Sequence, residues 1–155
     1  MKYLDYAVTF SEFPDEIALC INITSCPFHC EGCHSPELRE DIGIELTTRE
    51  LAKLIESNKG ITLVGFMGGD ANPALINTFA AFVVCNYKGL KVGWYSGRNA
   101  LPKEIDTDWF DYIKFGPYIE KLGGLNNPNT NQRMFHYTEV DVKDITHKFW
   151  KNGKR

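Results

Sequence analysis

Three cysteines fall within one short stretch of the sequence, at Cys26, Cys30 and Cys33, with the spacing Cys-x3-Cys-x2-Cys. Thiolates are the soft ligands that zinc ions and iron–sulfur clusters select. Three thiolates are one fewer than the four ligands of a closed structural site. Either another side chain fills the fourth position, or the position is open, and an open position is where metal chemistry takes place. The stretch therefore predicts a metal centre.

One candidate for a fourth ligand is His34, which directly follows Cys33. A Cys3His set is common at structural zinc sites, but two adjacent side chains have difficulty sharing one tetrahedral ion. The other two cysteines, Cys20 and Cys85, lie among apolar neighbours in the sequence. We expect both of them to be core thiols without a metal.

Two glycine-containing segments, Gly68-Gly69-Asp70 and Ser96-Gly97-Arg98, are the other candidates for binding a ligand. They follow apolar runs at 61–66 and 90–95, which are typical of buried strands, and the cysteine stretch follows a similar run at 17–23. The carboxyl ends of parallel strands meet at one edge of a sheet, where ligands bind. We therefore expect the three segments to converge.

The elements that would position these segments alternate along the chain. Thr47 and Glu50 have the spacing of a capping box, which predicts a helix over 48–57. The other expected elements are strands at 3–10, 17–23, 61–66, 90–95, 111–116 and 133–138, and helices at 73–87 and 142–150. Such alternation predicts an α/β fold with a mainly parallel sheet, in a single domain over residues 1–155. The polar segment 120–132 is expected to be a long loop that acts as a lid or a binding loop.

Composition excludes some classes of function. The chain has 17 basic and 20 acidic residues and a formal net charge of −3, which gives no electrostatic case for binding nucleic acid. No apolar run approaches the roughly 20 residues of a membrane helix, so no membrane association is expected. Lys2 and Asp5 come too early for a signal peptide. We expect a cytoplasmic protein, and in that reducing compartment clustered cysteines favour metal binding or catalysis over disulfides.

The cysteine motif resembles the signature of the radical S-adenosylmethionine enzymes. More narrowly, the chain resembles the activating proteins of anaerobic (class III) ribonucleoside-triphosphate reductase. The segments that carry this second resemblance follow the order of the family: 25–34, 68–70, 94–97, 115–118 and 131–133. Gly32 precedes the third cysteine, at a place where many radical S-adenosylmethionine enzymes have an aromatic residue that contacts adenine. A glycine there is similar to the reductase activators and unlike pyruvate formate-lyase activase.

The resemblance implies an incomplete (βα) barrel with a curled sheet, since a full barrel typically needs about 250 residues. It also implies a [4Fe-4S] cluster on Cys26, Cys30 and Cys33, whose fourth iron binds the amino and carboxylate groups of S-adenosylmethionine. The residues that would bind this second cofactor are Gly32, Gly68, Gly69, Asp70 and Ser96. Asp70 would accept a hydrogen bond from the ammonium group of S-adenosylmethionine, and Ser96 would form a hydrogen bond with the carboxylate or the ribose of the same cofactor.

The implied reaction is the activation of a partner protein. An electron donor such as flavodoxin or ferredoxin would reduce the cluster, and S-adenosylmethionine would be cleaved to methionine and a 5′-deoxyadenosyl radical. The radical would take a hydrogen atom from a glycine of anaerobic ribonucleoside-triphosphate reductase. Two alternatives stay open. One is a radical S-adenosylmethionine enzyme that acts on a small molecule or on another glycyl-radical enzyme, and the other is a zinc-stabilised interaction module that uses His34 as the fourth ligand.

Overall fold

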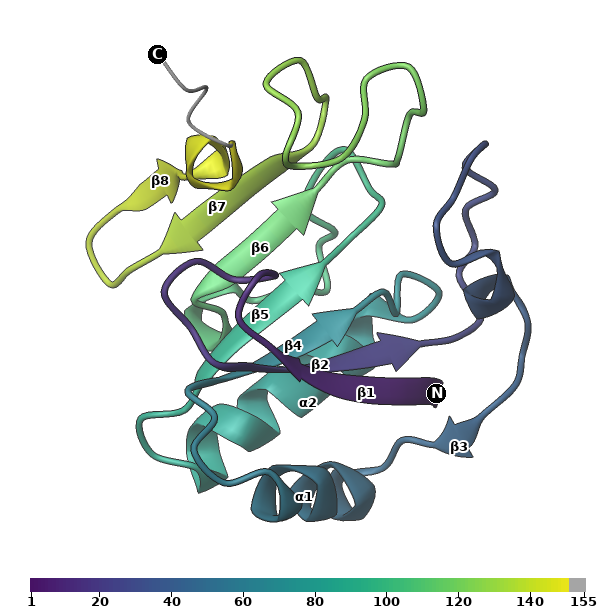
Figure 1. Ribbon diagram of the computed structural model, residues 1–155. Coiled ribbons are helices and arrows are strands. Elements are labelled where there is room, and N and C mark those ends of the chain that lie inside the picture. Colours follow the sequence, from purple (N-terminus) through teal and green to yellow (C-terminus); the bar gives the residue numbers. More distant parts are fainter. Residues whose placement is uncertain (151–155) are drawn as a thin grey trace.

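The computed structural model describes residues 1–150, which form one eight-stranded sheet and two α-helices (Figure 1). In chain order the elements are β1 (Lys2–Thr9), β2 (Ala18–Ile23), β3 (Ile44–Glu45), α1 (Thr48–Ser57), β4 (Leu63–Met67), α2 (Pro73–Asn86), β5 (Lys91–Tyr95), β6 (Tyr112–Phe115), β7 (Arg133–Tyr137) and β8 (Val142–Asp144). Short 3-10 helices occupy Pro36–Arg39, Thr107–Trp109 and Thr146–Phe149. No helix within residues 1–150 is both long enough and apolar enough to cross a lipid bilayer.

The strands lie in the order β3-β1-β2-β4-β5-β6-β7-β8. The four middle strands, β2, β4, β5 and β6, are parallel, and the strands on either side of them are antiparallel to their neighbours. The α/β class is therefore confirmed. The expectation of a mainly parallel sheet is wrong, because three strand pairs are parallel and four are antiparallel. Parallel neighbours need long crossover connections, whereas β1–β2 and β7–β8 are consecutive strands that turn back on themselves.

The two α-helices lie within one residue of their predicted bounds. The Thr47 hydroxyl accepts a hydrogen bond from the Glu50 N–H at 3.1 Å, as a helix N-cap does, so α1 begins where the capping pattern places it. The side-chain oxygen of Asn72 caps α2 in the same way, at 3.2 Å from the Leu75 nitrogen, and Pro73 occupies the first turn.

The predicted C-terminal helix over 142–150 is wrong. Val142–Asp144 forms β8, which pairs with β7, and only the four residues Thr146–Phe149 turn as a 3-10 helix. The Asp144 carboxylate accepts hydrogen bonds from both the N–H and the hydroxyl of Thr146, at 2.9 and 2.6 Å. This side chain supports the turn that ends the strand. Backbone pairing with β7 is thus stronger here than local helix propensity.

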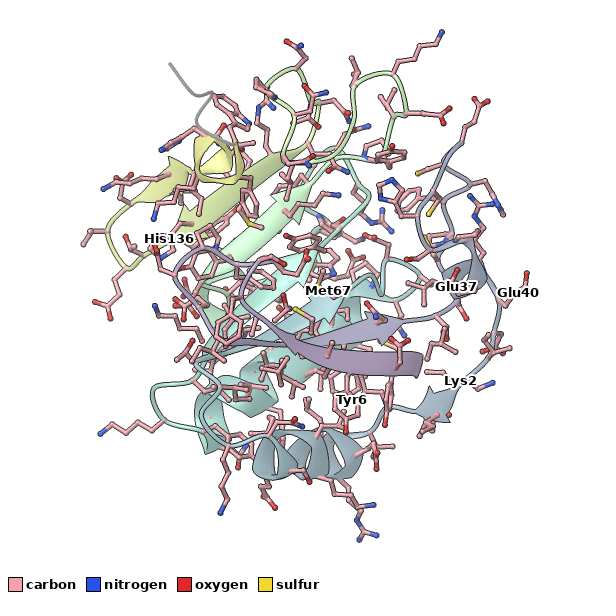
Figure 2. All side chains as sticks on the ribbon, in the orientation of Figure 1. Lys2, Tyr6, Glu37, Glu40, Met67 and His136 are labelled. Carbon is pink, nitrogen blue, oxygen red and sulfur yellow. The ribbon has the colours of Figure 1, made fainter. Side chains whose placement is uncertain are left out.

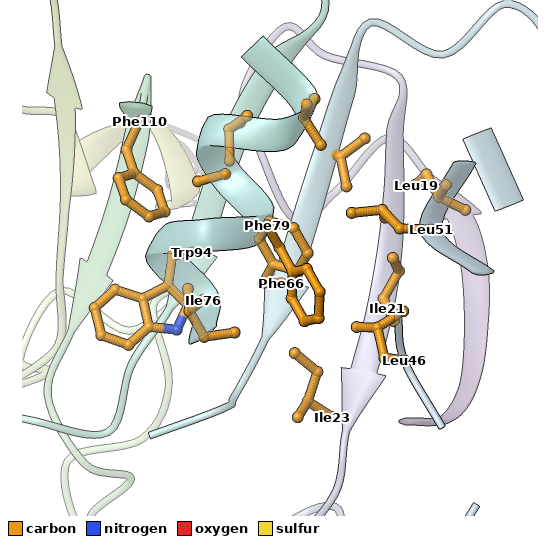
Figure 3. Packing of buried hydrophobic residues seen from close by; sticks show 14 of the residues in the cluster. Leu19, Ile21, Ile23, Leu46, Leu51, Phe66, Ile76, Phe79, Trp94 and Phe110 are labelled. Atoms are coloured by element: carbon orange, nitrogen blue, oxygen red, sulfur yellow. The ribbon is translucent and has the colours of Figure 1, made fainter. Parts of the chain in front are cut away.

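The main hydrophobic core lies between the sheet and the two helices (Figure 3). Its fully buried large side chains come from both layers and include Leu19, Ile21, Ile23, Leu51, Phe66, Ile76, Phe79 and Trp94. The two α-helices therefore cover only one face of the sheet.

A second, smaller core lies on the opposite face and is centred on Phe13, from the loop between β1 and β2. The Phe13 side chain is completely buried and lies directly over two glycines, Gly65 of β4 and Gly93 of β5. A Cβ atom at either glycine would come within 2.5 or 2.2 Å, respectively, of a ring carbon of Phe13. The rings of Tyr95 and Tyr112 pack around it with centroids at 5.2 and 5.8 Å. Glycine interrupts these strands because an aromatic ring approaches closely.

The amino ends of the parallel strands are joined by one buried carboxylate, Glu16. Its oxygens accept hydrogen bonds from the Lys91 ammonium at 2.6 Å, the Tyr112 hydroxyl at 3.1 Å and the Thr62 hydroxyl at 2.6 Å. These partners stand at the beginnings of β5, β6 and β4, respectively. Glu16 therefore fixes this end of the sheet, and ligand-binding chemistry is left to the other end.

Candidate functional site

The cysteine loop follows β2 and is held by its own backbone. The Cys26 N–H donates to the Leu38 carbonyl at 2.9 Å, which ties the start of the loop to the short helix at its end. The Cys33 N–H donates to the Cys30 carbonyl at 3.3 Å and closes a turn. Gly32 has φ +69° at the third position of this turn, where a type II turn requires a positive φ. Gly32 thus has a backbone role, which is to bring Cys30 and Cys33 close together.

The three cysteines line one cavity of about 580 Å³ at the carboxyl ends of the parallel strands. This volume lies within the usual range of small-molecule sites, about 300–1,000 Å³. The cavity is lined by residues from β1, β2, β4, β5 and β6 and from the loop that follows β6. Met67, at the end of β4, also lines it and lies near the middle of the molecule (Figure 2). Of the predicted cofactor-binding residues, Gly68 lines the cavity, whereas Gly32, Gly69, Asp70 and Ser96 do not.

The three thiols line the same cavity, but they are not close enough together to coordinate one metal ion. Within residues 1–150 no group of three or more His, Cys, Asp or Glu side chains is placed so that it could hold a metal ion. All three thiols are partly buried and none forms a disulfide. Burial raises the pKa of Cys26, and the negative charges of Asp70, Cys30 and Cys33 raise it further. A positive charge nearby would therefore favour the thiolate forms that a metal needs.

Two cationic side chains provide that charge. Arg39 and Lys114 line the cavity, and Glu12 is the one carboxylate among its described lining residues. An Arg39 Nη donates to the Cys30 carbonyl at 2.7 Å, while Arg39 Nε is buried and has no hydrogen-bond partner in the described part of the chain. The donor chemistry of the cavity, three thiols beside two cations, therefore fits a thiolate-bound cluster of net negative charge.

Lys114 was not foreseen from the sequence, although a lysine inside the apolar run of β6 is an unusual signal. Its side chain is 8% exposed, and its ammonium donates to the carbonyls of Gly116 at 2.7 Å and Ser96 at 3.4 Å. The nitrogen also lies 5.8 Å from the centre of the Tyr95 ring. Burial lowers the pKa of Lys114 to about 8, against the opposing effect of Asp70, Cys30 and Cys26. The side chain is a buried cation held by neutral partners.

The two glycine-containing loops converge, as expected, but their polar side chains bind one another. The Asp70 carboxylate, 2% exposed, accepts hydrogen bonds from the Ser96 hydroxyl at 2.6 Å and the Gly97 N–H at 2.9 Å. It also forms an ion pair with the Arg98 guanidinium at 3.4 Å. These contacts lock the end of β4 to the end of β5, so Asp70 and Ser96 position the loops around the cavity.

The glycines Gly68 and Gly69 have different reasons for lacking a side chain. Both have positive φ angles, +100° and +91°. A Cβ atom at Gly69 would lie 2.4 Å from Ile76 Cδ1, so this glycine allows α2 to pack close to the loop. Gly68 faces the cavity, and its carbonyl accepts a hydrogen bond from the Trp94 indole N–H at 2.8 Å. Its N–H donates to the Tyr95 carbonyl at 3.0 Å, so Gly68 borders the cavity with its backbone groups already bonded within the protein.

The loop after β6 lies over the cysteine loop. The ring of Tyr118 packs against the ring of His34 in a tilted arrangement, with the centroids 4.8 Å apart, and a Cβ atom at Gly32 would lie 2.9 Å from the carboxyl carbon of Glu120. Tyr118, Gly124 and Gln132 also line the cavity. The segment that the sequence marks as a lid or binding loop is therefore a wall of the site.

The two remaining cysteines differ from each other. Cys20 is buried beside the cavity, and burial raises its pKa to about 12, which agrees with the expected core thiol. Cys85 is exposed, so its assignment to the core is wrong. The buried face of α2 consists of Ile76, Phe79, Ala80 and Val83, and Cys85 falls outside it.

No model of a known protein family, no curated protein and no solved structure matches this chain.

Proposed function

We propose that this protein is a radical S-adenosylmethionine enzyme that activates a glycyl-radical enzyme, with anaerobic ribonucleoside-triphosphate reductase as its protein substrate. The observation that carries the proposal is the shared cavity, which Cys26, Cys30 and Cys33 line together at the carboxyl ends of parallel strands. The cations Arg39 and Lys114 support it, because they suit an occupant of net negative charge.

In this proposal the three thiols hold a [4Fe-4S] cluster, and S-adenosylmethionine occupies the rest of the cavity. When bound, the cluster would supply one electron for the cleavage of S-adenosylmethionine to methionine and a 5′-deoxyadenosyl radical, which would take a hydrogen atom from a glycine of the partner and become 5′-deoxyadenosine. A cytoplasmic donor such as flavodoxin or ferredoxin would supply the electron. The twisted sheet then acts as an incomplete (βα) barrel, and its open side gives a protein substrate access.

The residues of the chain take distinct roles in this scheme. Gly32 permits the turn that brings two of the thiols together. Gly68 lines the cavity without a side chain, which leaves room for the amino-acid end of S-adenosylmethionine. Asp70 and Ser96 fix the two loops that border the ligand, and so act as positioning residues. Lys114 offsets the negative charge that a thiolate-bound cluster brings into a buried site.

Anaerobic reconstitution with iron and sulfide tests the cofactor. We expect about four iron atoms per chain, and formation of 5′-deoxyadenosine when S-adenosylmethionine and a reductant are added. Cys26→Ala, Cys30→Ala or Cys33→Ala should each abolish this product, whereas the matched controls Cys20→Ala and Cys85→Ala should not. One tightly bound zinc ion with no iron would contradict the proposal and favour an interaction module.

The target of the reaction needs a separate measurement. Electron paramagnetic resonance of the reconstituted protein mixed with the reductase should show a glycyl radical. Cleavage of S-adenosylmethionine without that signal, coupled to turnover of a metabolite, would favour an enzyme that acts on a small molecule. The two cysteine controls apply to this assay as well.

A further inference from the structure

The outer edge of β1 is open along most of its length. Lys2 and Tyr3 pair with β3, but residues 5–9 pair only with β2 (Figure 1). Within residues 1–150 no other backbone hydrogen bond reaches residues 5–9. A row of unpaired backbone donors and acceptors is a template for another strand.

This edge lacks the charges that usually protect an exposed strand. Asp5 is the one charged residue between Leu4 and Phe10, and the segment contains no lysine and no proline. Tyr6, Val8 and Phe10 are instead exposed apolar side chains, at 44%, 42% and 74%. Figure 2 shows Tyr6 on β1, away from the cysteine loop. An edge of this composition is suited to pairing.

The two faces of β1 differ in a way that restricts what could pair with it. Tyr6 and Val8 stand opposite Ile21 and Leu19 of β2, so they share the face that the helices cover. Ala7 stands opposite Cys20, and Ala7 and Thr9 both line the cavity. A strand added to this edge would alternate in the same manner, with every second residue facing the cavity.

We propose that residues 5–9 of β1 are the docking strand for an extended segment of the protein substrate. The inference rests on the proposed function, which requires a glycine to reach the cavity. Alternation then places the glycine on the face of Ala7 and Thr9, and places its two immediate neighbours beside Tyr6 and Val8. The segment therefore carries glycine between two apolar residues. The occupant is a polypeptide because only an extended backbone matches a row of strand donors and acceptors.

The experiment uses the full chain in its metal-free, reduced form and synthetic peptides as probes. One peptide has a central glycine flanked by valines, and its control has the same sequence with alternate amide nitrogens methylated. Amide hydrogen exchange followed by nuclear magnetic resonance should slow at residues 5–9 with the first peptide and not with the second. Failure of the first peptide to protect these amides would overturn the proposal.

Two matched variants locate the surface. Val8→Lys places a charge on the open edge and should weaken peptide binding by about fivefold, roughly one cross-strand side-chain pair. Val142→Lys places the same charge on β8, the other edge of the sheet, at a position that is also half exposed, and should leave binding unchanged. Equal binding by both variants would contradict the assignment. Concentration-dependent protection of the same amides without peptide would show that a second copy of this chain occupies the edge, and would also overturn it.

The outcome is separable from that of the proposed function. Protection by the peptide in a protein that forms no cluster would leave the docking strand standing and remove the radical chemistry. If the wild type and Val8→Lys form the glycyl radical at the same rate, the radical chemistry stands and the docking strand is overturned.

Discussion

The contact between Phe13 and the glycines beneath it allows a quantitative prediction. Phe13 is completely buried, and replacing a buried phenylalanine by alanine lowers the free energy of unfolding by about 3–5 kcal/mol. We expect Phe13→Ala to lower the free energy of unfolding by about 4–5 kcal/mol, near the upper end of this range. The reason is that Gly65 and Gly93 have no side chains that could close over the cavity left by the ring.

A second substitution tests whether this contact is the cause. A Cβ atom at Gly93 would lie 2.2 Å from a Phe13 ring carbon, so Gly93→Ala in the wild type should cost about 1–3 kcal/mol through overpacking. In the Phe13→Ala background the same methyl group fills part of the hole and should restore about 0.8 kcal/mol. The double variant should therefore be about 2–4 kcal/mol more stable than the sum of the two single effects predicts.

Urea unfolding of the four metal-free, reduced chains measures this coupling, provided that their denaturant slopes agree. Gly124→Ala is the control, because the nearest atom to a Cβ there is 3.8 Å away, and it should add to Phe13→Ala within about 0.5 kcal/mol. Additive effects of Phe13→Ala and Gly93→Ala would refute the packing described here. Phe13→Leu replaces Phe13→Ala in the cycle if the alanine variant does not fold.

Three further substitutions test single features. Burial lowers the pKa of Lys114 in the folded state from 10.5 to about 8, so the unfolded state binds more protons between these values and stability should rise by about 3 kcal/mol across that window. Lys114→Met should remove this rise when unfolding free energies are compared from pH 7 to 11. Asp70→Asn should lower the unfolding free energy by about 1–3 kcal/mol, because an amide cannot accept hydrogen bonds on both of its terminal atoms, and equal stability would contradict the loop lock. Thr47→Ala should lower it by about 1 kcal/mol through loss of the α1 cap, while Thr48→Ala should change it little.

Local patterns predicted the elements that local physics determines. The apolar runs gave β2, β4 and β5 to within two residues, and the capping residues gave the starts of both α-helices. These signals arise from burial and from unsatisfied backbone donors, which act over a few residues. The convergence of the three loops followed from the parallel order of the strands. The cavity position of Cys26, Cys30 and Cys33 was therefore foreseeable.

Contacts between distant segments were not foreseeable in the same way. β8 was predicted as helix because nothing within 142–150 shows that β7 lies beside it. Phe13 falls between the strands expected at 3–10 and 17–23, and only the folded sheet reveals that its ring fills the space above two glycines of other strands. The hydrogen bonding and the pKa of the buried Lys114 ammonium likewise depend on groups from the loop after β5 and from the cysteine loop. Each of these depends on the tertiary structure rather than on sequence neighbours.

Two buried carboxylates stand at opposite ends of the parallel strands. Glu16 holds the amino ends of β4, β5 and β6, and Asp70 holds the carboxyl ends of β4 and β5 together. Strands tied at both ends open only when the whole unit unfolds, whereas β1 has neither tie and can separate locally. Amides of β4 and β5 should therefore exchange slowest, and local opening should be greatest in β1 and in the loops around the cavity.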